Sequence, residues 1–158
     1  MHMNEPDPNV STVLKSAQLL HAALTLGLIT FGAVVLFLML SGSDPMAAEE
    51  STSSRDNAAF DVLGIAAPIG ATVIAFLIRV FLGRVASGMN ASAIIMGRHI
   101  VFIAILEGGG LMGIVVSLIS DSPAGLIAAA LPLIALLATW PTRARFDPDH
   151  DPRIAWDS

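Results

Sequence analysis

The sequence contains no cysteine and no tyrosine, and only 13% of its 158 residues are charged. Without cysteine, disulfide bonds, thiolate catalysis and cysteine-based zinc sites are excluded. Without tyrosine, a phenolic proton donor is excluded as well. Only eight residues are lysine or arginine and the net charge is −5, so we do not expect the chain to bind nucleic acid.

Apolar residues are abundant where charged residues are few. They make up 54% of the chain, and the mean hydropathy is +0.75. A typical soluble domain has about 25% charged residues, so this chain lacks the polar surface needed to face water on all sides. In a bilayer the outer surface faces lipid instead. We therefore expect a single membrane domain over residues 1–158, in which the lipid bilayer is itself a partner.

Four apolar runs predict an all-α fold, a polytopic bundle of four transmembrane helices. A span needs about 20 residues. The first run is longer than the ~7–15-residue core of a signal peptide, so we interpret it as a retained anchor, with a cleaved signal as the alternative. The last run is short, contains Pro132 and would cross nearly upright. In chain order, we expect a flexible tail at 1–14, spans at 17–40, 60–82, 99–119 and 123–140, and a flexible tail at 141–158.

The distribution of basic residues predicts the orientation. With four spans, the two tails and the 83–98 connector share one side of the membrane. Basic residues near membrane ends favour the cytoplasm. The opposite side holds only Arg55, so we expect both termini in the cytoplasm of a bacterium and a multi-pass protein of its inner membrane. The seven basic residues on the cytoplasmic side are Lys15, Arg79, Arg84, Arg98, Arg143, Arg145 and Arg153.

Glu107 is an ionisable residue near the middle of the third span. It lies about 12 Å past the start of that span at a rise of 1.5 Å per residue. An ionised acid at this depth costs at least ~2.5–3.5 kcal/mol on insertion scales, and acids inside membranes usually mark ion paths or proton relays. We therefore expect Glu107 to bind a proton or a cation. The alternative is a structural hydrogen bond that joins two helices.

His21 and Arg79 are the candidate partners of Glu107, because both lie about one turn inside the cytoplasmic half of their spans. A positive group in the bundle would compensate an ionised carboxylate. Alternatively, both side chains anchor the protein at the membrane surface, which the long stem of Arg79 permits.

Small residues predict close helix packing around Glu107. Two pairs of small residues are spaced by four positions, a pattern that lets helix backbones approach in lipid. Packing within the chain and a dimer face are both compatible with it. The expected packing residues are Ala104, Gly108, Gly109, Gly110 and Gly113.

Enzyme chemistry and metal binding are not expected. The chain has no nucleophile elbow, no HExxH motif and no Cys–His pair. The Asp-x-Asp-x-Asp spacing of Asp147, Asp149 and Asp151 lacks the glycine and glutamate of a calcium loop, so we interpret it as a solvated tail. No cofactor is expected.

Two resemblances bear on function. The run ILEGGGLMGIVV at 105–116 resembles the ion-binding helix of the rotary ATP synthase c subunit, and 60–119 resembles its hairpin; this implies that Glu107 is the ion-binding acid. The c-subunit connector motif Arg-Gln-Pro is missing from 83–98, and two further spans flank the hairpin. The chain also resembles small bacterial four-helix membrane proteins of uncharacterised function, through Ala104 to Gly108 and through Pro141-Thr142 with Arg145.

These observations lead to two functional expectations. The first is a small membrane bundle that binds or relays a proton or cation at Glu107. The alternative is an accessory or assembly subunit of a larger membrane complex, whose partner is a second copy of the chain or another membrane protein.

Overall fold

Four helices make up the computed structural model of the chain, which describes residues 8–41, 54–85 and 91–142. The helices are α1 (Pro8–Leu40), α2 (Ser54–Val85), α3 (Ala91–Ser120) and α4 (Ala124–Ala138). The described ranges contain no strand, so the predicted all-α class with four helices is confirmed for them.

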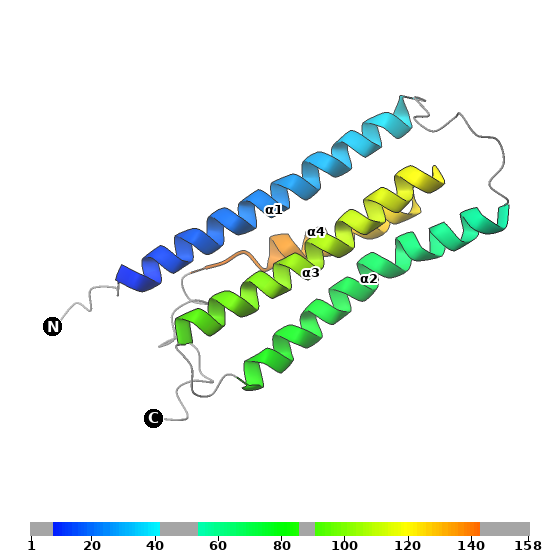
Figure 1. Cartoon of the computed structure of the whole chain (residues 1–158). Helices are drawn as coiled ribbons and strands as arrows, with labels where there is room; N and C mark the ends of the chain where they lie inside the picture. The colour runs from blue at the N-terminus through cyan, green and yellow to red at the C-terminus, as the bar shows by residue number, and fades with distance from the viewer. Residues whose placement is uncertain (1–7, 42–53, 86–90, 143–158) are drawn as a thin grey trace.

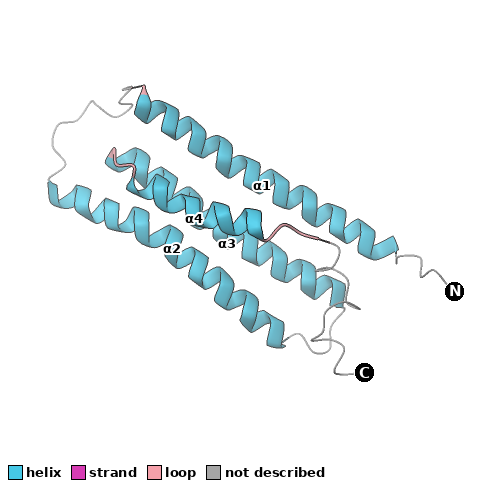
Figure 2. Ribbon diagram, turned by 180° about the vertical axis from the view of Figure 1, so that it is seen from behind, coloured by secondary structure: helices cyan, strands magenta, loops and turns pink. Residues whose placement is uncertain are grey.

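Helices α3 and α4 lie between α1 and α2 (Figures 1 and 2). Both α1 and α2 pack against both members of this central pair. Helix α3 contributes more buried apolar side chains than any other helix, including Phe102, Ile103 and Leu106, each of which is at most 1% exposed. The side chains of α3 therefore determine what lies inside the bundle.

Three of the helices are long and apolar enough to cross a membrane by length and composition. Their apolar segments are Ser11–Leu40, Ala58–Phe81 and Ile95–Ser120, whereas Ala124–Ala138 is a shorter apolar helix. Large apolar side chains face outward on all four helices; examples are Leu26, Leu77, Met112 and Ile127.

The helix ends differ from the expected span ends. The tail expected at 1–14 is corrected, because α1 already begins at Pro8. Proline suits the first turn of a helix, where its missing N–H would have no partner in any case. Helices α2 and α3 likewise begin before 60 and 99, since a helix continues past the apolar segment that marks a span.

Helix α4 ends earlier than expected. Its last residue is Ala138, and Thr139 donates its backbone N–H to the carbonyl oxygens of Ala135 and Leu136, both at 3.1 Å. Pro141 disfavours helical geometry at the preceding Trp140, which explains the stop. Pro141 is buried, so the tail expected from 141 begins inside the fold. Residues 143–158 lie outside the described residues.

Helices α2, α3 and α4 meet at Gly64, Gly113 and Gly125, which we call the glycine crossing. A Cβ atom at Gly113 would lie 2.7 Å from the carbonyl oxygen of Gly125 and 3.3 Å from that of Gly64. These distances leave no room for a side chain, so three backbones approach closely at this point.

Candidate functional site

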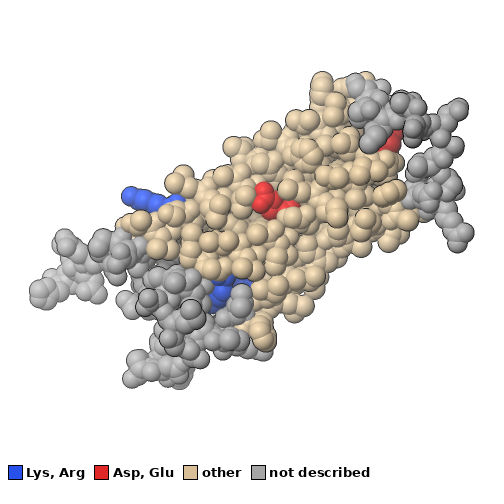
Figure 3. All heavy atoms as spheres, viewed as in Figure 1, with Lys and Arg blue, Asp and Glu red and all other residues tan. Residues whose placement is uncertain are grey.

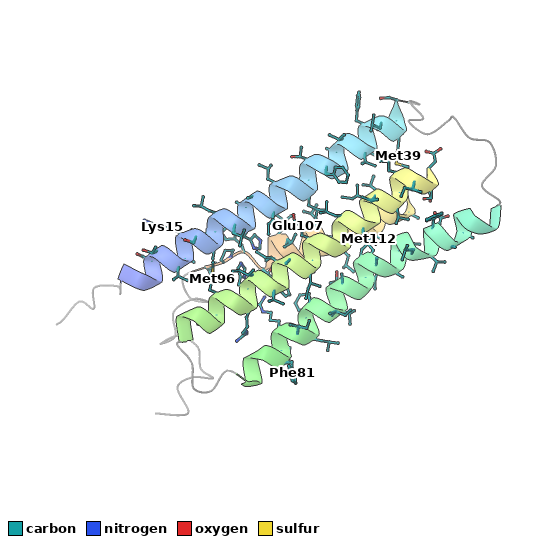
Figure 4. All side chains as sticks on the ribbon, in the orientation of Figure 1. Lys15, Met39, Phe81, Met96, Glu107 and Met112 are labelled. Atoms are coloured by element: carbon teal, nitrogen blue, oxygen red, sulfur yellow. The ribbon has the colours of Figure 1, made fainter. Side chains whose placement is uncertain are left out.

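Glu107 lies midway along α3, between Met96 and Met112 (Figure 4). Its side chain is partly exposed. The space-filling view shows an acidic patch near the middle of a face on which the surrounding residues are uncharged (Figure 3). The carboxyl group is therefore at the surface of the bundle and not in its interior.

Glu107 stands at the border between the inner and outer faces of α3. Leu106 is fully buried, whereas Ala104 and Gly108 are exposed. Within the described ranges, no hydrogen bond or ion pair joins Glu107 to another side chain. The side chain of Glu107 can therefore be reached from outside the bundle, next to the small residues Ala104 and Gly108.

The small residues of α3 are divided between two faces. Gly109 packs against Ala71 of α2, Gly110 lies beside Leu28 of α1, and Gly113 belongs to the glycine crossing. An added Cβ at Gly108, in contrast, would meet no atom within 4 Å. Of the five expected packing residues, Ala104 and Gly108 therefore lie on the exposed face.

His21 is buried in a contact with two other helices. Its Nε2 lies 2.9 Å from the carbonyl oxygen of Leu136 in α4, and its Nδ1 lies 3.3 Å from Nε2 of His99 in α3. The two imidazole rings stack, with centroids 5.3 Å apart and an interplanar angle of 16°. Trp140 packs edge-on at 5.2 Å. Both ring nitrogens of His21 are thus engaged away from Glu107.

Polar groups continue on both sides of His21 along α1. One turn earlier, Gln18 donates from Nε2 to the carbonyl oxygen of Pro141 at 3.1 Å, which holds the segment after α4 against α1. One turn later, the hydroxyl of Thr25 is buried without a hydrogen-bond partner in the described part of the chain. We call His21, Thr25, His99 and Trp140 the histidine cluster; His21 and Thr25 are buried, His99 is partly buried and Trp140 is 40% exposed.

Arg79 is placed against an aromatic ring. Its guanidinium carbon lies 5.0 Å from the ring centroid of Phe102, which also packs edge-to-face with Phe76. A cation over an aromatic face is attracted by the ring quadrupole. The expected grouping of His21, Arg79 and Glu107 is therefore not what the geometry presents: His21 pairs with His99 and Arg79 with Phe102.

His99 is the residue that sequence reasoning left out. It begins the third apolar run, which places it at the expected edge of a span. In the expected four-span topology, the first and third helices run in the same direction, and both histidines lie in the first half of their apolar segments. Their position toward the same end of the bundle was the available signal for a contact between residues 78 positions apart.

The described residues offer no metal site. Among them, no group of three or more histidine, aspartate or glutamate side chains is arranged to hold a metal ion. The aspartates at 147, 149 and 151 lie outside the described residues.

No family model matches the chain, and comparisons with curated proteins and with solved structures also give no match.

Proposed function

We propose that the chain is an integral membrane protein that crosses the bilayer four times, with both termini in the cytoplasm, and that it binds and releases a proton at Glu107. The support for the membrane location is the outer surface of the bundle. Leu19, Phe37 and Leu40 of α1 are 73%, 69% and 79% exposed. Apolar surface of this extent suits lipid and is rare on soluble monomers.

The position of Glu107 carries the functional part of the proposal. Its carboxyl group lies midway along the central helix and reaches the surface of the bundle beside small residues. Ionising it among lipid chains costs at least ~2.5–3.5 kcal/mol on insertion scales, so it carries a proton until a polar group or water approaches. An acid that gives up its proton only on such contact suits a relay at a protein surface.

A proton fits this site better than a metal cation. A hard cation such as Ca²⁺ needs about 6–8 oxygen ligands, and Mg²⁺ needs an octahedral set. Glu107 contributes one carboxylate, and among the described residues it belongs to no group of three or more side chains able to hold a metal ion. A proton needs only the carboxylate itself.

The test is modification of the protein in lipid vesicles by a hydrophobic carbodiimide, which reacts with protonated carboxyl groups in apolar surroundings. We expect one modified site per chain, Glu107, with labelling that falls as the pH rises. Glu107→Gln should abolish the labelling, and Asp61→Asn, which alters an acid near the beginning of α2, should leave it unchanged. Unmodified Glu107, or labelling that does not depend on pH, would count against the proposal.

A second candidate function is a subunit of a larger membrane assembly. The observation that favours it is the exposed pair Ala104 and Gly108, with no atom within 4 Å of an added Cβ at Gly108. Small residues four apart on an outer face allow another helix to approach closely. A helix docked there would also cover Glu107, which would give its proton a polar partner.

A further inference from the structure

The contact between His21 and His99 lies inside the bundle and apart from Glu107. His21 is fully buried, as is Leu136, whose carbonyl oxygen it contacts. We infer that the two rings, here called the imidazole pair, form a second proton-binding site that takes up one proton as a unit. This inference does not depend on the role of Glu107.

Hydrogen-bond geometry fixes the hydrogens of the neutral pair. The Leu136 carbonyl oxygen only accepts, so Nε2 of His21, at 2.9 Å, carries a hydrogen and donates it. In a neutral imidazole the other nitrogen then has a lone pair. Nδ1 of His21 therefore accepts from Nε2–H of His99 at 3.3 Å. One hydrogen thus bridges the two rings.

Proton uptake adds one hydrogen and one positive charge to the pair. In the neutral pair, His99 carries its hydrogen on Nε2, so its Nδ1 has a lone pair. The added proton therefore binds to Nδ1 of His99. The bridging hydrogen can then shift from Nε2 of His99 to Nδ1 of His21, and the charge divides between the rings. Charge-assisted hydrogen bonds are shorter and stronger than neutral ones, so the 3.3 Å contact should tighten.

Burial disfavours a cation at this position, and several neighbouring groups offset part of that cost. Leu136 lies in the last turn of α4, where the helix dipole is negative and attracts positive charge. The Trp140 ring is in contact with His21, and aromatic rings interact favourably with cations. The buried hydroxyl of Thr25, one turn away, is a further group able to hydrogen-bond a charged site or its water.

The charged side chains around the pair come from three helices. On α1, Lys15 is exposed to the outside. On α3, Arg98 precedes His99 and is partly exposed, and Glu107 follows His99 by about 12 Å. Leu136 of α4 presents its carbonyl oxygen to His21, Trp140 follows α4, and Arg79 of α2 lies over Phe102. The cations oppose proton uptake and the negative end of α4 favours it, whereas a protonated Glu107 carries no charge and has no such effect.

The test is nitrogen NMR of the two imidazoles in the full chain. His2 and His150 are replaced by glutamine, so that only the pair remains of the four histidines. The chain is placed in lipid nanodiscs and titrated from about pH 8.5 to about pH 4.5, the range in which histidine changes charge. We expect both rings to respond at one common midpoint, with uptake of one proton per chain.

Matched variants separate a coupled pair from two ordinary histidines. His99→Gln should shift the midpoint of His21 by about one pH unit or more, a tenfold change in proton affinity. Glu107→Gln should leave the common midpoint in place, which distinguishes this site from the proposed one. Separate midpoints for the two rings, or a His21 midpoint unaffected by His99→Gln, would overturn the inference.

A second readout uses Trp140, which touches His21. Trp156→Phe leaves Trp140 as the sole tryptophan of the chain. Because an imidazolium quenches indole fluorescence on contact, Trp140 emission should fall with the same midpoint as the NMR titration. Emission that is independent of pH while the rings titrate would also contradict a shared charge at His21.

Discussion

Thr25 places a polar hydroxyl group in a buried position. It is 5% exposed, and its hydroxyl has no partner among the described residues. An unsatisfied buried hydroxyl costs about 1–3 kcal/mol of desolvation. Thr139, in contrast, donates its hydroxyl to the carbonyl oxygen of Ala135 at 2.7 Å. The two threonines therefore form a matched comparison.

Thr25→Val should raise the free energy of unfolding by about 1 kcal/mol, because it removes the unsatisfied hydroxyl and keeps the shape. The measurement is reversible unfolding in mixed micelles at a pH where the imidazole pair is neutral. Thr139→Val, which removes a satisfied hydrogen bond, should lower the same free energy by about 0.5–1.5 kcal/mol. A loss of equal size in both variants would show that the Thr25 hydroxyl is hydrogen-bonded.

For individual residues, the sequence singled out Glu107 but did not reveal the contact between His21 and His99. An acid inside an apolar run is visible as a local contrast. The partner of His21 depends on which helices pack and at what rotation, and those quantities arise from contacts between distant segments. The same limit applies to Arg79, whose neighbour Phe102 belongs to another helix.

Helix α3 differs from the others because three consecutive glycines face three directions. Gly109 faces α2, Gly110 faces α1 and α4, and Gly108 faces outward. Each glycine costs about 1 kcal/mol relative to alanine in water-based measurements of helix stability. The close approach to neighbouring helices explains two of the three, but nothing within the bundle requires Gly108.

Gly109→Ala should destabilise the bundle by about 1–3 kcal/mol, because its Cβ would overlap that of Ala71 and push α2 away. Gly108→Ala should be neutral or stabilising by up to about 1 kcal/mol, since the added methyl group meets no atom of the chain. Thermal unfolding in detergent, followed by circular dichroism, compares the two directly. Equal losses would mean that α3 is rotated from the orientation described.

The helices themselves were predictable, whereas their ends were less so. Apolar runs identify where a helix can cross a membrane, so all four were located from hydropathy. Hydropathy does not register the helical turns that lie beyond an apolar run, which is why α1 begins at Pro8 and not at 17. Helix α4 ends before Pro141, and a count of apolar residues does not detect this local signal.

The whole molecule presents two kinds of outer surface. Most of it carries large apolar side chains, and one strip of α3 carries Ala104 and Gly108 beside Glu107. A large side chain suits lipid, whereas a small one suits another helix. A strip of small side chains within a surface of large ones is expected where another helix docks. Because the chain has no cysteine, single introduced cysteines can test this strip by crosslinking.

Gly108→Cys should give a covalent dimer on mild oxidation in native membranes, if two copies meet through this strip. Ile127→Cys, on the outer face of α4 at 71% exposure, is the control and should remain monomeric. Gel electrophoresis without reducing agent gives the yield of dimer. Similar yields at both positions would indicate random collision, and an unlinked Gly108→Cys would leave a different membrane protein as the partner in the assembly hypothesis.

The unequal lengths of α1 and α4 have a consequence for the membrane itself. Helix α4 has 15 residues, roughly 22 Å at 1.5 Å per residue, whereas the 33 residues of α1 extend over about 50 Å. A bilayer core is about 30 Å thick, so under the proposed four-span topology the lipid beside α4 would thin, whereas the lipid beside α1 would not. Such a hydrophobic mismatch on one flank costs fractions of a kcal/mol per Å. It would draw shorter-chain lipids to the α4 side and favour thin bilayers over thick ones.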